Sequence, residues 1–104
     1  MIKSFPAAKL EQIPEDGGRF VSILGNPIAL FRRGTEVFAI DDRCPHMGSS
    51  LSAGSVENGV VTCPWHGWRF RIDDGAWVSC PNNRNRVYPV DVKDGTVYVS
   101  METE

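Results

Sequence analysis

The side chains of this sequence that bind transition metals most strongly are concentrated in one stretch. The segment CPHMGSSLSAGSVENGVVTCPWHGWRF, residues 44–70, contains Cys44-x-His46 and, sixteen residues later, Cys63-x-x-His66. Thiolate and imidazole ligands together suit zinc or an iron–sulfur cluster. Each pair is close enough in sequence to occupy one loop tip. A framework that brings two loop tips together would therefore complete one metal site.

The framework predicted from the rest of the chain consists mainly of β-strands. Short apolar runs alternate with turn signals every ~8–12 residues, which is typical of a β-sandwich or barrel. Strands are predicted at residues 19–24, 28–33 and 36–40, with further hairpins at Asp94-Gly95 and at the turn 73–75. Pro89 indicates an edge strand or a bulge.

Helical evidence is weak. Only residues 7–13, AAKLEQI, could form about two helical turns, which Pro14 would end. Residues 44–70 form a long insertion between predicted strands, and insertions of this kind usually carry function.

Length, composition and charge limit the class of protein. The chain has 104 residues, 41% of them apolar and 23% charged, so we expect one domain, 1–104, that folds on an apolar core without needing a metal. The formal charge of −2 and the lack of a basic run argue against nucleic-acid binding. No apolar stretch approaches the ~20 residues of a membrane span, and the first residues do not resemble a signal peptide. Three cysteines make a secreted disulfide framework unlikely, so we expect a cytoplasmic protein.

The motifs CPHMG and CPWHGW resemble the two cluster-binding boxes of Rieske proteins, C-x-H and C-x-x-H. The resemblance covers nearly the whole chain, because LSAG, RFRIDDGAW and CPNNRNRVYPVDVKDGTVYV also match small Rieske domains. It implies an antiparallel β-sandwich with a small cluster-binding subdomain built from two loops. It also implies a [2Fe–2S] cluster, with Cys44 and Cys63 on the inner iron and His46 and His66 on the outer iron.

Departures from the respiratory members of the family narrow the prediction. Those members have a cysteine in each box that forms a disulfide behind the cluster, where this chain has Ser49 and Trp65. They also place a serine where this chain has Trp68, so we expect a soluble protein with a low-potential cluster. Rieske oxygenases carry a further iron on two histidines and a carboxylate. The cluster would take both histidines of this chain, so the protein is expected to be an electron carrier and not an enzyme.

Two functions follow from the resemblance. The first is a Rieske ferredoxin, monomeric, that carries electrons from a flavin-dependent reductase to a terminal Rieske oxygenase. The alternative is the small subunit of an assimilatory nitrite reductase, whose partner is the large subunit. The four intact ligands and the CPWHGWRF motif favour the ferredoxin. A zinc site and a regulatory module that merely keeps the fold are rivals outside the redox class.

The third cysteine and the aromatic residues near the boxes are expected to have packing roles. Cys80 is predicted to be a small buried side chain and not a ligand. Trp68 and Trp77 are predicted to pack in the core or shield the cluster. Gly67 and Gly48 are expected to let the loop tips turn tightly.

Residues near the predicted cluster also suggest a docking face. Trp65 and Met47 are candidates for that face, although an apolar shield around the cluster explains Met47 equally well. Arg43, Arg84 and Arg86 could form a basic rim that steers an acidic partner, although solvated loop arginines explain them slightly better.

Overall fold

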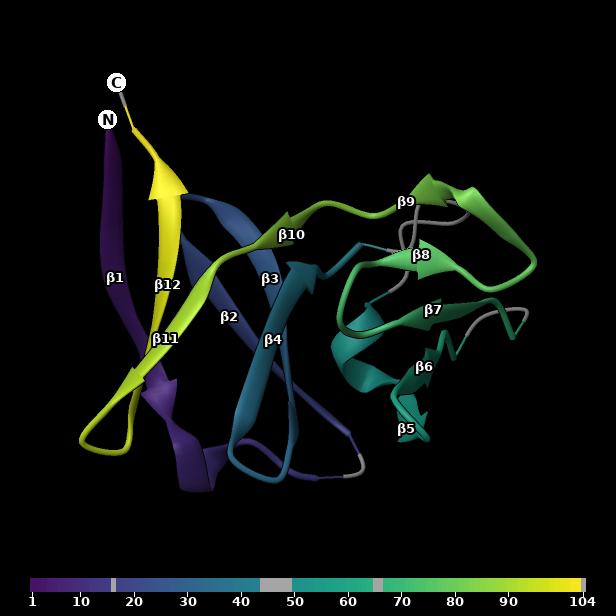
Figure 1. Cartoon of the computed structure of the whole chain (residues 1–104), viewed down its shortest axis with the longest axis horizontal. Coiled ribbons are helices and arrows are strands. Elements are labelled where there is room, and N and C mark those ends of the chain that lie inside the picture. Colours follow the sequence, from purple (N-terminus) through teal and green to yellow (C-terminus); the bar gives the residue numbers. More distant parts are fainter. Residues whose placement is uncertain (16, 44–49, 65–66, 104) are drawn as a thin grey trace.

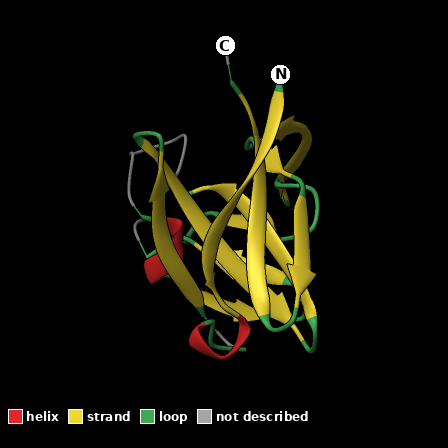
Figure 2. Cartoon of the chain, turned by 90° about the vertical axis from the view of Figure 1, so that its left-hand side faces the viewer, coloured by secondary structure: helices red, strands yellow, loops and turns green. Residues whose placement is uncertain are grey.

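The computed structural model describes residues 1–15, 17–43, 50–64 and 67–103 of the chain. Nearly all regular structure in these residues is β-strand, with two short 3-10 helices (Figure 2). The strands are β1 Ile2–Lys9, β2 Gly18–Ile23, β3 Asn26–Arg33, β4 Glu36–Asp41, β5 Ser55–Glu57, β6 Val60–Thr62, β7 Arg69–Arg71, β8 Ala76–Trp77, β9 Cys80–Arg84, β10 Val87–Tyr88, β11 Val90–Lys93 and β12 Thr96–Glu102. The helices are η1 Leu10–Gln12 and η2 Leu51–Ala53. No helix in the described part of the chain is long and apolar enough to cross a membrane.

The strands form three antiparallel sheets (Figure 1). Their orders are β1-β12-β11, β10-β4-β3-β2 and β5-β6-β7-β8-β9. The first two sheets make up a base that contains both chain termini, and β1 pairs with β12 from Ile2 opposite Glu102 onward. The third sheet forms a separate lobe, on the right of Figure 1.

Strand β3 connects the two parts because both of its faces are buried. Ile28 and Leu30 contact the core of the base, whereas Ala29 and Phe31 contact a second core. Side chains alternate between the two faces of a strand, so four consecutive apolar residues serve two cores. The second core also contains Leu51 of η2 and residues of the lobe, namely Val61, Cys63, Phe70 and Ile72.

The predicted mainly β architecture is confirmed. Strands β2, β3 and β4 lie within one or two residues of the predicted ranges. The hairpin at Asp94-Gly95 joins β11 to β12, and both residues have positive φ. Residues 73–75 join β7 to β8 as predicted. Pro89 lies between β10 and β11, which are edge strands of two different sheets among the described residues.

The predicted helix at residues 7–13 is wrong. Ala7, Ala8 and Lys9 belong to β1, and Ala8 and Lys9 pair with Val97 and Thr96 of β12. Only Leu10–Gln12 turns, as a 3-10 helix. The pairing with β12 satisfies the backbone in extended form, and such tertiary contacts override a weak helical preference.

Candidate metal centre

Of the four predicted ligands, Cys63 is the one that the structure describes. Cys44, His46 and His66 lie outside the described residues, together with Met47, Gly48, Ser49 and Trp65. The structure does show how the chain enters and leaves both ligand-bearing segments, residues 44–49 and 65–66. The site can therefore be built from its anchors.

Cys63 occupies the inner side of the candidate site. It follows β6 directly, is a free thiol and is 1% exposed in the second core. Its backbone N–H donates to the carbonyl of Trp68 at 2.6 Å, which closes the turn that contains CPWHGW. The thiol is therefore fixed on the protein side of the loop, away from solvent.

Gly67 allows that turn to close. Its φ of +70° lies in the left-handed region, where a side chain would be strained. A Cβ at this position would meet no atom of the described residues within 4 Å, so within that part of the chain the requirement comes from the backbone conformation. This agrees with the turn role predicted for Gly67; Gly48 is outside the described residues.

The first ligand-bearing segment is held at both ends. Arg43 and Ser50, which flank residues 44–49, form an antiparallel β-bridge. The Asp42 carboxylate is only 4% exposed and accepts hydrogen bonds from the Ser50 hydroxyl at 2.6 Å and the Ser52 N–H at 2.8 Å. Because buried carboxylates need such partners, Asp42 locks the exit of the segment. This role of Asp42 was not predicted from the sequence, since nothing in the local pattern distinguishes Asp42 from an exposed acidic residue.

Trp68 and Trp77 pack beside the site, as predicted. Their rings stack with centroids 4.1 Å apart and planes 2° apart, and both contact the core that contains Cys63. Trp68 also lies tilted against Phe70, with 6.5 Å between the centroids. Stacked indoles supply a large apolar surface that limits the access of water from this side.

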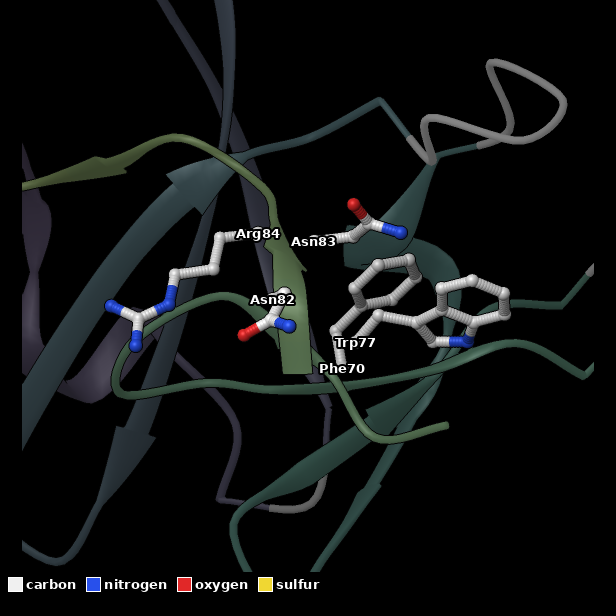
Figure 3. A pocket seen from close by; sticks show the side chains of 5 residues that line it. All are labelled: Phe70, Trp77, Asn82, Asn83 and Arg84. Carbon is white, nitrogen blue, oxygen red and sulfur yellow. The ribbon is translucent and has the colours of Figure 1, made fainter. Parts of the chain in front are cut away.

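A hollow next to these rings is lined by Phe70, Trp77, Asn82, Asn83 and Arg84 (Figure 3). Its volume is about 490 Å³. Figure 3 shows that the guanidinium group of Arg84 extends away from the two aromatic rings. The hollow thus has apolar walls on one side and amide and guanidinium groups on β9.

Cys80 differs from its prediction as a buried side chain. It begins β9, is only half-buried, and its sulfur accepts a hydrogen bond from Asn83 Nδ2 at 3.4 Å. An exposed edge of β9 allows this contact, because most residues of the strand face solvent. Cys80 is a free thiol.

The three arginines of the proposed rim differ in their environment. Arg43 forms an ion pair with Asp41 at 3.2 Å, and this hydrogen-bonded contact raises the pKa of the guanidinium. Arg86 lies over the ring of Tyr88, 4.9 Å from its centroid. Arg84 is exposed, and the described residues provide it with no carboxylate partner. Among the described residues, Arg43 is thus the one of the three whose charge is paired with a carboxylate.

The donor set suits an iron–sulfur cluster with mixed ligands. The Cys63 thiol is buried in an apolar core, at a loop closed by the Cys63 N–H and the Trp68 carbonyl, and the Cys44–His46 pair follows the end of β4 in the sequence. Two thiolates and two imidazoles on two loops fit a two-iron cluster, whose inner side is apolar. The described residues alone contain no group of three metal-binding side chains, since three predicted ligands lie outside them.

Comparison with known families gives one match that spans most of the chain. Residues 3–98 match the model of the Rieske [2Fe–2S] domain. The chain is also 39% identical over 97 residues to the ferredoxin subunit of 3-phenylpropionate/cinnamic acid dioxygenase from Photorhabdus laumondii, with 91% of each chain covered. It is 38% identical over 97 residues to the ferredoxin subunit of anthranilate 1,2-dioxygenase from Burkholderia cepacia, which covers 92% of this chain and 90% of that protein.

Solved structures give the same relationship. A chain in a complex of reduced oxygenase and oxidized ferredoxin of carbazole 1,9a-dioxygenase matches with a TM-score of 0.84 and 32% identity, over 97% of this chain and 95% of that chain. The carbazole 1,9a-dioxygenase ferredoxin from Nocardioides aromaticivorans matches with a TM-score of 0.84 and 26% identity, over 93% and 96%. The putative NADH-dependent nitrite reductase small subunit from Mycobacterium tuberculosis matches with a TM-score of 0.89 and 25% identity, over 100% and 99%.

Proposed function

The chain belongs to the Rieske [2Fe–2S] domain family, and we propose that it is the ferredoxin component of an oxygenase system. In this role it carries single electrons from a flavin-dependent reductase to a terminal Rieske oxygenase. The protein is an electron-transfer protein and not a catalyst of its own. The observation that carries the proposal is the match to two dioxygenase ferredoxin subunits over about nine-tenths of both chains.

We assign Cys44, His46, Cys63 and His66 as the ligands of the [2Fe–2S] cluster. When bound, a cluster of this type takes up and releases one electron at a time. Cys63 supports the assignment because its thiol is buried, and because its backbone N–H donates to the carbonyl of Trp68 and so closes the loop whose sequence contains His66. A buried cysteine side leaves the histidine side of the site as the route for electrons.

The surrounding residues limit both the access of water to the site and the movement of the chain around it. The stacked Trp68 and Trp77 restrict access of water to the side that contains Cys63. Asp42 and Ser50 keep the exit of the first ligand-bearing segment in place. A rigid apolar enclosure favours electron exchange with little rearrangement of the protein around the site.

The terminal oxygenase is the partner with the most direct support. A matched structure is described as a complex of reduced oxygenase and oxidized ferredoxin of carbazole 1,9a-dioxygenase. We propose that this chain docks on a similar oxygenase, as a cytoplasmic monomer, and receives its electron from a flavin-dependent reductase. Nucleic acid and membrane are not expected partners of a chain with this charge and composition.

A second candidate function is the small subunit of a nitrite reductase. It is supported by the fold, which matches the putative subunit from Mycobacterium tuberculosis over both whole chains at 25% identity. The ferredoxin subunits are closer in sequence, at 38–39% identity, and this favours the oxygenase system.

An anaerobic reductive titration followed by mixing with an acceptor tests the proposal. We expect one electron per chain, followed by loss of the reduced signal when an oxidised terminal Rieske oxygenase, such as that of a carbazole dioxygenase, is added. Oxidation by a sirohaem nitrite reductase large subunit, and not by the oxygenase, would support the second candidate. A protein that takes up no electron would contradict both.

A further inference from the structure

Asn85 connects parts of the chain that are far apart in sequence. It lies between β9 and β10 and is partly buried. Its side-chain nitrogen Nδ2 donates to the carbonyl of Asp41 at 2.9 Å and to the carbonyl of Arg43 at 3.1 Å. The two acceptors lie at the end of β4, where the chain enters the first predicted ligand pair.

The backbone around Asn85 adds two further contacts. The N–H of Asn85 donates to the carbonyl of Gly75 at 2.8 Å, and the N–H of Asp41 donates to the carbonyl of Arg86 at 2.8 Å. A Cβ on Gly75 would lie 2.5 Å from the carbonyl oxygen of Asn85. The end of β4, the turn between β7 and β8, and the segment after β9 therefore meet at this residue.

The chemistry of the contact requires a side chain with two donors. Two backbone carbonyls face the amide, so its nitrogen and not its oxygen must point toward them. An aspartate of the same size would present only acceptors, and serine offers a single donor. The carbonyl of Arg43 belongs to the planar peptide bond that leads to Cys44, so holding it restrains the entry to the ligand segment.

We propose that Asn85 is a positioning residue for the metal centre: it ties the entry of the first ligand-bearing segment to the segment between β9 and β10. The exit of that segment is held by the Asp42 carboxylate and by the bridge between Arg43 and Ser50. Loss of the Asn85 amide removes two hydrogen bonds at the entry and leaves these contacts in place. This inference rests on the proposed function, because it assumes that Cys44 and His46 hold the cluster.

The test compares Asn85→Ala and Asn85→Ser with Asn82→Ala in the cluster-containing protein. Asn82 is an exposed amide of β9 that lines the hollow and makes no hydrogen bond to the end of β4, so it is a matched control. The readouts are the rate at which an iron chelator bleaches the protein, the g-values of the dithionite-reduced state and the thermal midpoint. The g-values report the ligand environment and do not respond to a general loss of stability.

We expect Asn85→Ala to lose iron about tenfold faster than the wild type, the factor that corresponds to about 1.4 kcal/mol, and to have shifted or broadened g-values. Asn85→Ser retains one donor and should be intermediate, and it also serves as the test if the alanine variant does not fold. Asn82→Ala should match the wild type. Unchanged iron release and g-values in a folded Asn85 variant would overturn the inference and leave the proposed function intact. A wild-type protein without a histidine-ligated cluster would overturn the proposed function, and the inference with it.

Discussion

Cys63 and Cys80 are both free thiols in environments suited to different roles. Cys63 is 1% exposed beside Trp68 and Phe70, at the closure of the loop that carries the second Cys–His motif. Cys80 is half-buried at the start of β9, where Asn83 donates a hydrogen bond to its sulfur. The burial and position of Cys63 are those of a structural ligand, whereas Cys80 belongs to the surface of the lobe.

This difference gives a direct prediction. Cys63→Ser should lose the visible absorption of the cluster, because serine is a poor replacement for a thiolate on iron. Cys80→Ser should retain the absorption and the iron content of the wild type. Absorption spectra and iron assays of both purified variants make the measurement. Loss of iron from Cys80→Ser, with iron retained by Cys63→Ser, would reverse the assignment.

The ion pair between Arg71 and Asp73 predicts a small dependence of stability on pH. A hydrogen bond from Arg71 lowers the pKa of the Asp73 carboxyl below its ordinary value of 3.8. Because the folded-state pKa is lowered, the stabilisation is present above pH 3.8 and is lost as the pH falls through the folded-state pKa. Both side chains are substantially exposed, so the pair contributes little to stability.

Urea unfolding of Asp73→Asn and of the wild type at several pH values checks the predicted direction of this pH dependence. The variant should be slightly less stable at pH 7, and the difference should disappear once the pH lies below the folded-state pKa of Asp73. A difference that grows as the pH falls would contradict the assigned direction.

At the level of the structural elements, the turn between β7 and β8 lies close to the backbone of the segment after β9. Gly75 has a φ of +71°, and a Cβ there would lie 2.5 Å from the carbonyl oxygen of Asn85. Gly34, between β3 and β4, has a φ of +65° and open space around the same position. The two glycines share a backbone requirement, but only Gly75 has a neighbouring backbone in the way.

Alanine at these two glycines should therefore have unequal effects. Gly34→Ala should cost about 1 kcal/mol, the strain of a left-handed alanine. Gly75→Ala should cost about 2–3 kcal/mol and should also speed loss of iron, since the clash displaces Asn85. Denaturant unfolding and chelator assays on both variants provide the data. Equal losses of stability in the two variants would show that the close approach of the Asn85 carbonyl adds nothing to the cost of a side chain at residue 75.

The strands could be predicted from sequence because their signals are local. Alternation and turn residues mark β2, β3, β4 and the Asp94-Gly95 hairpin without knowledge of the fold. The helix predicted at residues 7–13 is wrong because β1 pairs with β12, which lies about ninety residues further along the chain. A pairing over that distance leaves no mark in the local pattern.

The same limit applies to the site. The two Cys–His pairs were recognisable because ligand spacing is a local feature. Asp42 and Asn85 were not, because each acts through contacts with residues 8 to 44 positions away. A polar residue near a strand end looks like an ordinary loop residue until those partners are known. The positions of Cys44, His46 and His66 remain predictions from sequence.

At the scale of the whole molecule, β3 links the stability of the base to that of the lobe. Leu30 and Phe31 are adjacent and both 0% exposed, yet Leu30 belongs to the core of the base and Phe31 to the core that contains Cys63. Leu30→Ala and Phe31→Ala should each cost about 3–4 kcal/mol. Only Phe31→Ala should change the g-values of the reduced protein. Equal changes in both variants would indicate that the two cores are not distinct.

Basic and acidic residues are distributed unevenly along the chain. Residues 43–88 contain five arginines and three acidic residues, whereas the rest of the chain contains six basic and ten acidic residues. Arg84 is exposed on β9, and no carboxylate among the described residues pairs with it. An uneven charge distribution of this kind steers association with an oppositely charged partner.

Charge reversal at Arg84 tests whether the surface around Arg84 contacts the terminal oxygenase that accepts the electron. Arg84→Glu should slow electron transfer to a terminal Rieske oxygenase about threefold or more at low salt, and the difference should shrink as salt rises. Arg19→Glu makes the same change on β2 of the base and should have a smaller effect. Stopped-flow rates at two ionic strengths make the comparison. Identical rates and salt dependence for the wild type and Arg84→Glu would show that Arg84 does not steer the partner, and would contradict the proposed basic rim.

The central claim is that two Cys–His pairs hold a two-iron cluster in this chain. The most direct measurement combines an iron and sulfide count with the EPR spectrum of the dithionite-reduced protein. We expect a red-brown protein with two irons and two sulfides per chain and the low average g-value of a histidine-ligated cluster. A colourless protein that holds one zinc would contradict the cofactor and, with it, the role in electron transfer.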